Sequence, residues 1–170
     1  NHKKSSSPIS DEISMLQKEK VSTKLEMFEV EEAFNATSKV LELIPDVANE
    51  LKSAKIYSTW DIMGGGVFST YLKREKMTSA RQGILDVNYA LNKMKRELKD
   101  INKEHFPEHL ELELSWEFVD YFFDNIFTDY NIGQKIGSAY NSCISVYNSL
   151  LPIEESLRKE KLRLENRFNE

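Results

Sequence analysis

The chain has 170 residues and a formal net charge of −5, and 40% of its residues are hydrophobic and 30% charged. This length corresponds to about one ordinary domain, and the composition excludes collagen-like, disulfide-stapled and intrinsically disordered classes. The acidic balance argues against general nucleic-acid binding, which needs a surplus of lysine and arginine. No apolar run approaches the roughly 18 residues of a membrane span. We therefore expect a soluble, cytoplasmic globular protein.

The first helical pattern runs from Ile13 to Leu51. Side chains at alternating spacings of three and four form one row along it, which is typical of a helix that packs lengthwise against a partner helix. The twelve positions of this row, nine of them apolar, are Ile13, Leu16, Lys20, Thr23, Met27, Val30, Phe34, Thr37, Leu41, Ile44, Ala48 and Leu51. Ser10 is a suitable N-cap, so we expect a helical domain over residues 10–170 after a disordered lead at residues 1–9.

A second row with the same rhythm contains no polar residue. It comprises Met77, Ala80, Ile84, Val87, Leu91, Met94, Leu98 and Ile101. Ser79 and Gln82 have the spacing of a capping box. The pattern therefore predicts a helix over residues 79–103 that starts at Ser79 or one residue earlier.

The third row predicts a helix from about residue 131 to about residue 168. It comprises Ile132, Ile136, Ala139, Cys143, Val146, Leu150, Ile153 and Leu157, and continues less regularly through Leu164 and Phe168. Such a helix would be roughly 55 Å long, so we expect it to pack antiparallel against the long first helix. Pro45 and Pro152 interrupt the two patterns, but the spacing continues through both, which favours kinks or nearly collinear continuation over chain reversal.

Three adjacent glycines, Gly64, Gly65 and Gly66, separate the first two patterns. Such a run suits a position that needs positive φ or close approach of another backbone. We expect a tight corner between two helices there. An anion site at the start of the next helix is the alternative, although no Gly-Lys-Ser/Thr sequence follows.

Residues 104–130 hold eight acidic side chains, eight aromatic side chains and no lysine or arginine. Asp120 and Asp124 lie one helical turn apart, with Glu117 one turn earlier, and like charges at this spacing destabilise a helix unless a positive group meets them. An internal salt-bridge network with the basic stretch around residues 73–81 is the first interpretation.

Two functional interpretations of this acidic segment remain open. A hard cation such as Mg²⁺, Mn²⁺ or Ca²⁺ could be bound by Asp120, Asp124 and Asp61. A basic partner could instead dock on Glu117, Trp116 and Phe122. No other cofactor is expected, because His105 and His109 are separated by Pro107 and no zinc motif is present. Cys143 lies on the third row and is expected to be a buried, inert thiol.

The opening of the acidic segment, Leu110 to Phe118, alternates apolar and polar residues with the period of a strand. The pattern allows a small β element near residues 110–116, for which Ile62 to Tyr71 is the only nearby partner rich in β-forming residues. From Ser115 onward the spacing returns to three and four, which predicts a short helix over residues 116–130.

Three stretches share a pattern with known proteins: Trp60-Asp61 through Gly64-Gly65-Gly66, Lys76 to Ala80, and Phe118 to Asp129. Together they resemble a group of bacterial helical-bundle proteins that have no assigned activity, and the similarity covers about residues 40–157. The resemblance implies a mainly helical fold and a bacterial origin, and it supplies no catalytic residue.

The sequence thus predicts an all-α bundle with two long coiled-coil-like terminal helices. Helical rows longer than a compact domain favour a non-enzymatic interaction or scaffold protein, which binds a partner protein or a second copy of itself. The competing hypothesis is an enzyme or metal-dependent binder centred on the aspartates of the acidic segment.

Overall fold

A computed structural model describes residues 8–62, 66–101 and 132–169, and within these ranges the chain is helical without any strand. The three helices are α1 (Pro8–Ile62), α2 (Gly66–Asp100) and α4 (Ile132–Asn169). The prediction of an all-α helical bundle is therefore confirmed. None of the described helices has a segment both long and apolar enough to cross a membrane.

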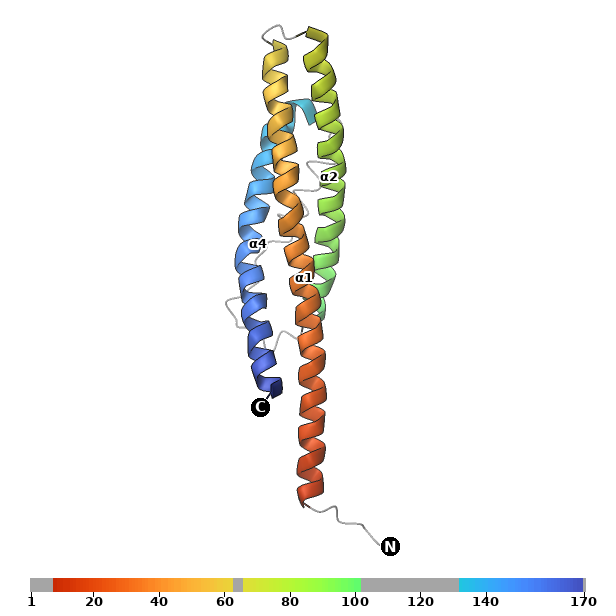
Figure 1. The fold of residues 1–170 in the computed structure, drawn as a ribbon, viewed down its shortest axis with the longest axis vertical. Helices are drawn as coiled ribbons and strands as arrows, with labels where there is room; N and C mark the ends of the chain where they lie inside the picture. Colours follow the sequence, from red (N-terminus) through yellow and green to blue (C-terminus); the bar gives the residue numbers. More distant parts are fainter. Residues whose placement is uncertain (1–7, 63–65, 102–131, 170) are drawn as a thin grey trace.

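The helices form an elongated bundle in which α1 contacts both of the others (Figure 1). Both α2 and α4 run antiparallel to α1 and make few contacts with each other within the described residues. Late residues of α4 consequently meet early residues of α1, as in the ion pair between Lys161 and Glu31. Because α1 must cover two neighbours, it needs a wider apolar face than a helix with one partner.

The sequence predicted much of the buried core but only one of the two apolar rows of α1. Every described member of the rows on α2 and on α4 through Leu157 is buried, as are most members of the α1 row from Thr23 onward. A further row, spaced by seven residues and also buried, comprises Ala33, Val40, Val47 and Ala54. This second row lets α1 pack against two helices at once.

The two helices of the α1–α2 pair approach each other closely at Gly83. A Cβ atom placed on Gly83 would lie 2.6 Å from Cγ2 of Val47, which is closer than real Cβ contacts allow. At the present separation of the two helices, a side chain larger than that of glycine does not fit at this position.

Both internal prolines lie within continuous helices. Pro45 lies inside α1 and Pro152 inside α4, and both side chains are exposed. Continuation of the helix, which the unbroken spacing predicted, is confirmed, because packing against neighbouring helices outweighs the local loss of one hydrogen bond at each proline.

The predicted helix starts were wrong in two places. Pro8 begins α1, so Pro8 and Ile9 are helical although both were expected in the disordered lead, whose residues 1–7 lie outside the described ranges. Proline suits this position, because the first helical residue needs no amide donor. The helix α2 begins at Gly66 and passes through Ser79, since an exposed serine costs a helix interior only a few tenths of a kcal/mol.

The proposed strand pairing is also wrong where it can be compared. Ile62 is the last residue of α1, and Gly66 to Tyr71 form the first turns of α2. The β-forming side chains of this stretch did not prevent helix formation, because helix packing overrides weak local preferences. The expected β element at 110–116 and the short helix at 116–130 lie outside the described residues.

Candidate interaction surface

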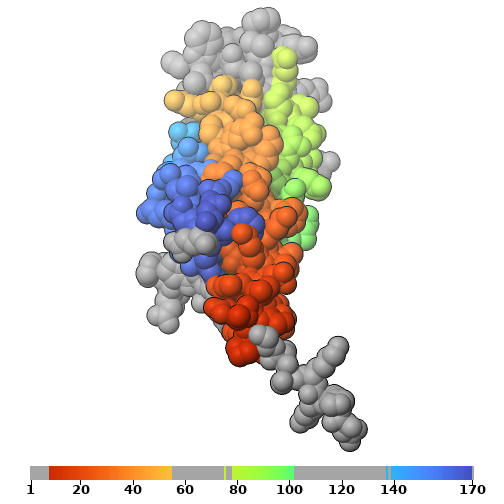
Figure 2. Space-filling view, turned by 60° about the horizontal axis from the view of Figure 1, so that its bottom comes forward, coloured from red at the N-terminus to blue at the C-terminus, as the bar shows by residue number. Residues whose placement is uncertain are grey.

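The N-terminal end of α1 extends beyond both neighbouring helices (Figures 1 and 2). Near the C-terminal end of α4, Arg167 pairs with Glu19 and the ring of Phe168 lies under the ammonium group of Lys20. We call residues 8–18 of α1 the projecting segment; its eleven residues correspond to about 16 Å of helix. Every residue from Pro8 to Ser22 is exposed, and Thr23 is the first buried one.

The projecting segment carries an apolar row that is not covered. Ile9, Ile13 and Leu16 are 68%, 50% and 60% exposed, and their spacing of four and three places them on one face. The same spacing continues through Lys20 to Thr23 and Val30, which are both buried in the bundle. The exposed row is therefore the direct continuation of a row that the bundle buries.

A second exposed apolar group follows further along α1. Val21, Leu25 and Phe28 are spaced by four and three residues and are each about 60% exposed. At 100° per residue they lie on a different side of the helix from Ile13 and Leu16. Single exposed apolar side chains are ordinary on a protein surface, but two rows within one half of a helix are typical of an interaction surface.

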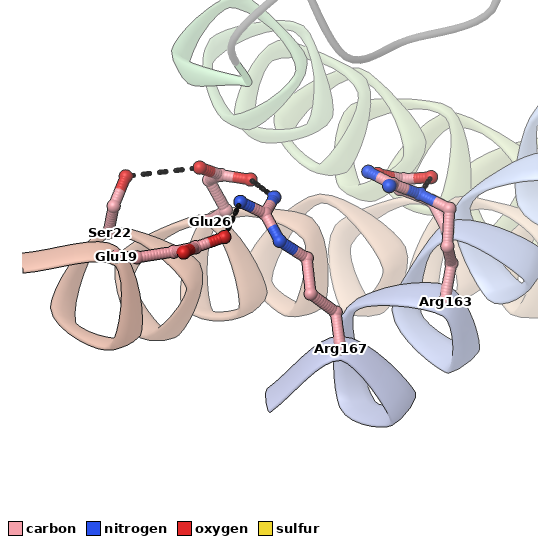
Figure 3. Close-up of polar contacts among 6 residues, drawn as sticks. Glu19, Ser22, Glu26, Arg163 and Arg167 are labelled. Atoms are coloured by element: carbon pink, nitrogen blue, oxygen red, sulfur yellow. Dashed lines mark hydrogen bonds and ion pairs between the residues drawn. The ribbon is translucent and has the colours of Figure 1, made fainter. Parts of the chain in front are cut away.

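Ion pairs fix the end of α4 against α1 where the projecting segment begins (Figure 3). Nη2 of Arg167 donates to Oε1 of Glu19 at 2.9 Å, and Nη1 of Arg167 lies 3.9 Å from Oε2 of Glu26. The other carboxylate oxygen of Glu26 accepts a hydrogen bond from Oγ of Ser22 at 3.1 Å. The Glu26 carboxylate thus lies between Ser22 and Arg167 and is mostly buried.

Further polar contacts line the same α1–α4 interface. Nζ of Lys161 donates to Glu31 at 2.9 Å and lies 6.0 Å from the ring centre of Phe34, while Ser38 donates to Glu154. The hydrogen bond to Glu31 raises the pKa of Lys161 above its ordinary value. Acidic side chains of α1 therefore meet Lys161 and Arg167 near the C-terminal end of α4.

Glu160 is a carboxylate within the apolar row of α4. It is buried between Leu157 and Leu164, and Arg163 donates to both of its oxygens at 2.8 and 2.6 Å. This hydrogen bonding raises the pKa of Arg163, and the nearby charge of Glu26 acts in the same direction. The arginine satisfies a carboxylate whose burial would otherwise be costly, so Glu160 and Arg163 have a structural role.

Most of the sequence-predicted site residues lie outside the described ranges. This applies to Asp120, Asp124, Glu117, Trp116 and Phe122. Their roles in metal binding or docking stay predictions.

The remaining predicted site residues fall at the junction of α1 and α2. Asp61 is in the last turn of α1 and Gly66 is the first residue of α2, whereas Gly64 and Gly65 lie between the helices and outside the described residues. Neither the tight corner nor the anion site is decided by these positions.

Metal-ligand groups and Cys143 remain to be placed within the described part of the chain. Within it, no group of three histidine, cysteine, aspartate or glutamate side chains is arranged to hold a metal ion. Cys143 is 1% exposed, and burial raises the pKa of its thiol from 9.0 to about 12. A thiol with this pKa is protonated at neutral pH and is a poor nucleophile.

Comparison of this chain with protein-family models, with curated proteins and with solved structures found no match. The argument about function therefore depends on the geometry of the molecule. The most distinctive feature of that geometry is the apolar row of the projecting segment.

Sequence reasoning identified two of the three row residues but not their exposure. Ile13 and Leu16 were assigned to a packed row, and Ile9 to the lead. Periodicity shows which side chains share a face, but it does not show where the neighbouring helix ends. The interruptions at Lys20 and Thr23 were the available signal, because they mark the change from a covered to an exposed row.

Proposed function

We propose that this protein is a non-enzymatic helical interaction protein and that the apolar row Ile9, Ile13 and Leu16 is its binding surface. The observation that supports this function is the continuity of the row, which is mostly buried from Thr23 onward and exposed before it. A helix that lies along such a row can bury its three side chains and recognise them by their spacing.

The described bundle holds the helix that carries this surface. An isolated helix of eleven residues is marginal in water, because helix nucleation is unfavourable. The projecting segment avoids this cost, since it extends a helix that is already held in the bundle by Val30, Ile44 and Leu51. The bundle thus presents a preformed helix to a partner, which lowers the entropy lost on binding.

Site-specific photo-crosslinking tests the proposal. A photoreactive phenylalanine analogue is placed at Ile13 or at Leu16 of the full chain, and at Lys18 as the control on another side of the same helix. We expect discrete adducts with a partner from the first two positions, abolished when Ile9→Asp is added to the same chain. Adducts of equal yield from Lys18, or no adduct from Ile13 and Leu16, would contradict the proposed function.

A further inference from the structure

The charges beside the apolar row indicate what kind of helix it binds. Glu12, Glu19 and Glu26 are spaced by seven residues and therefore lie along one edge of the row. On the bundle side, Arg167 of α4 contacts the last two of these glutamates. Glu12 lies one heptad further toward the N-terminus of α1 and is exposed.

The position of α4 indicates the direction in which such a helix runs. The helix α4 packs antiparallel to α1, and near its end it contacts Glu19 and Lys20. The apolar row continues past this point along the same face through Leu16, Ile13 and Ile9, which are all exposed. A helix that continues the line of α4 would cover these side chains without displacing the contacts of Arg167 and Phe168.

A second copy of the chain fits this surface poorly. In an antiparallel pair of projecting segments, Ile13 of one copy would lie against Leu16 of the other. The same register would place Glu12 of one copy beside Glu19 of the other, twice along one edge of the pair. Like charges at these positions are destabilising, so charge favours a different helix.

We propose that the projecting segment binds an amphipathic helix of another protein, antiparallel to α1, with arginine or lysine on the edge that meets Glu12. This inference rests on the proposed function and specifies the chemistry of the partner. The bound helix repeats toward Glu12 what Arg167 does toward Glu19. The acidic edge provides specificity for a basic partner, and the apolar row provides the surface that is buried on binding.

Binding of designed peptides to the full chain tests the proposal. Three synthetic helices share one row of leucines and differ only in the edge residues, which are arginine, glutamine or glutamate. Fluorescence anisotropy should show the arginine peptide binding about tenfold more tightly than the glutamate peptide, and this ratio should fall with added salt. Ile13→Asp should weaken binding of the arginine peptide at least about tenfold.

A charge reversal on the protein isolates the role of the acidic edge. Glu12→Lys should remove the preference for the arginine peptide, whereas Glu32→Lys, an equal charge change at an exposed site outside the projecting segment, should leave it unchanged. Equal binding of the three peptides, or no binding, would overturn the inference. A dimer of the chain alone that Ile13→Asp abolishes in sedimentation would also overturn it, but would leave the proposed function standing.

Discussion

The same substitution at two positions of one row should have very different effects on stability. Leu16 and Leu51 belong to the same apolar row of α1, but Leu16 is 60% exposed and Leu51 is fully buried. Leu51→Ala leaves a cavity between packed helices and loses the burial of the side chain. For buried leucines this loss is about 2–5 kcal/mol. Leu16→Ala removes a side chain that makes little contact, so its effect should stay within about 0.5 kcal/mol.

Urea unfolding followed by circular dichroism measures both effects. The midpoint for Leu51→Ala should fall clearly while the slope with denaturant stays unchanged. In thermal unfolding, a loss of about 3 kcal/mol in a chain of this size corresponds to a lower Tm by roughly 6–12 °C. Leu16→Ala should unfold with the parent protein, because alanine is also a good helix former.

One result would refute the reasoning about the exposed row. If Leu16→Ala lowered the free energy of unfolding by as much as Leu51→Ala, the projecting segment would be covered in solution. The apolar row would then be part of the core and not a binding surface. A chain with Lys18→Ala provides the reference for a substitution at an exposed position of the same segment.

Three further predictions concern the packing of the bundle, its ion pairs and its buried cysteine. Gly83→Ala should lower the free energy of unfolding by about 1–3 kcal/mol, because the added Cβ would overlap Val47. Adding Val47→Ala to the same chain should relieve the overlap, which a double-mutant cycle in urea can show. Arg167→Gln should cost about 1 kcal/mol or less, since its ion pairs are partly exposed, and the loss measured by urea unfolding should shrink with added salt. The Cys143 thiol should react with a thiol reagent only after unfolding. Burial raises the pKa of this thiol from 9.0 to about 12, because the folded protein favours the neutral form. The thiol therefore does not reduce stability below pH 9, but the protein loses stability as the pH rises from 9 toward 12, where the unfolded chain releases the proton more readily. The stability of the parent chain should therefore fall more steeply over this range than that of Cys143→Ala.

The sequence was most informative where one helix meets one neighbour. The rows on α2 and α4 were identified because each helix presents a single apolar face, as Ile84, Leu91, Val146 and Leu150 illustrate. Spacing alone was sufficient there, since residues three or four positions apart, about one turn, lie on the same side of a helix.

The sequence was less informative about α1, which serves two neighbours. Ala33 and Ala54 carry little side chain, so they contribute weakly to any hydrophobic pattern, yet both are fully buried. Both are buried because α2 and α4 pack against α1, which is a property of the assembled bundle. The start of α2 was missed for a related reason, because packing along α1 extends the helix through Ser79.

The candidate surface could not be predicted from the sequence in the same way, because exposure depends on where other helices end. Ile13 and Val30 satisfy the same spacing rule, and the positions where α2 and α4 end make the first a surface residue and the second a core residue. Exposed isoleucine and leucine in a regular row reduce solubility, and three of them on one segment need a compensating benefit. In the proposed function, transient burial against a partner helix would provide that benefit. That helix would begin next to Arg167, which contacts both Glu19 and Glu26.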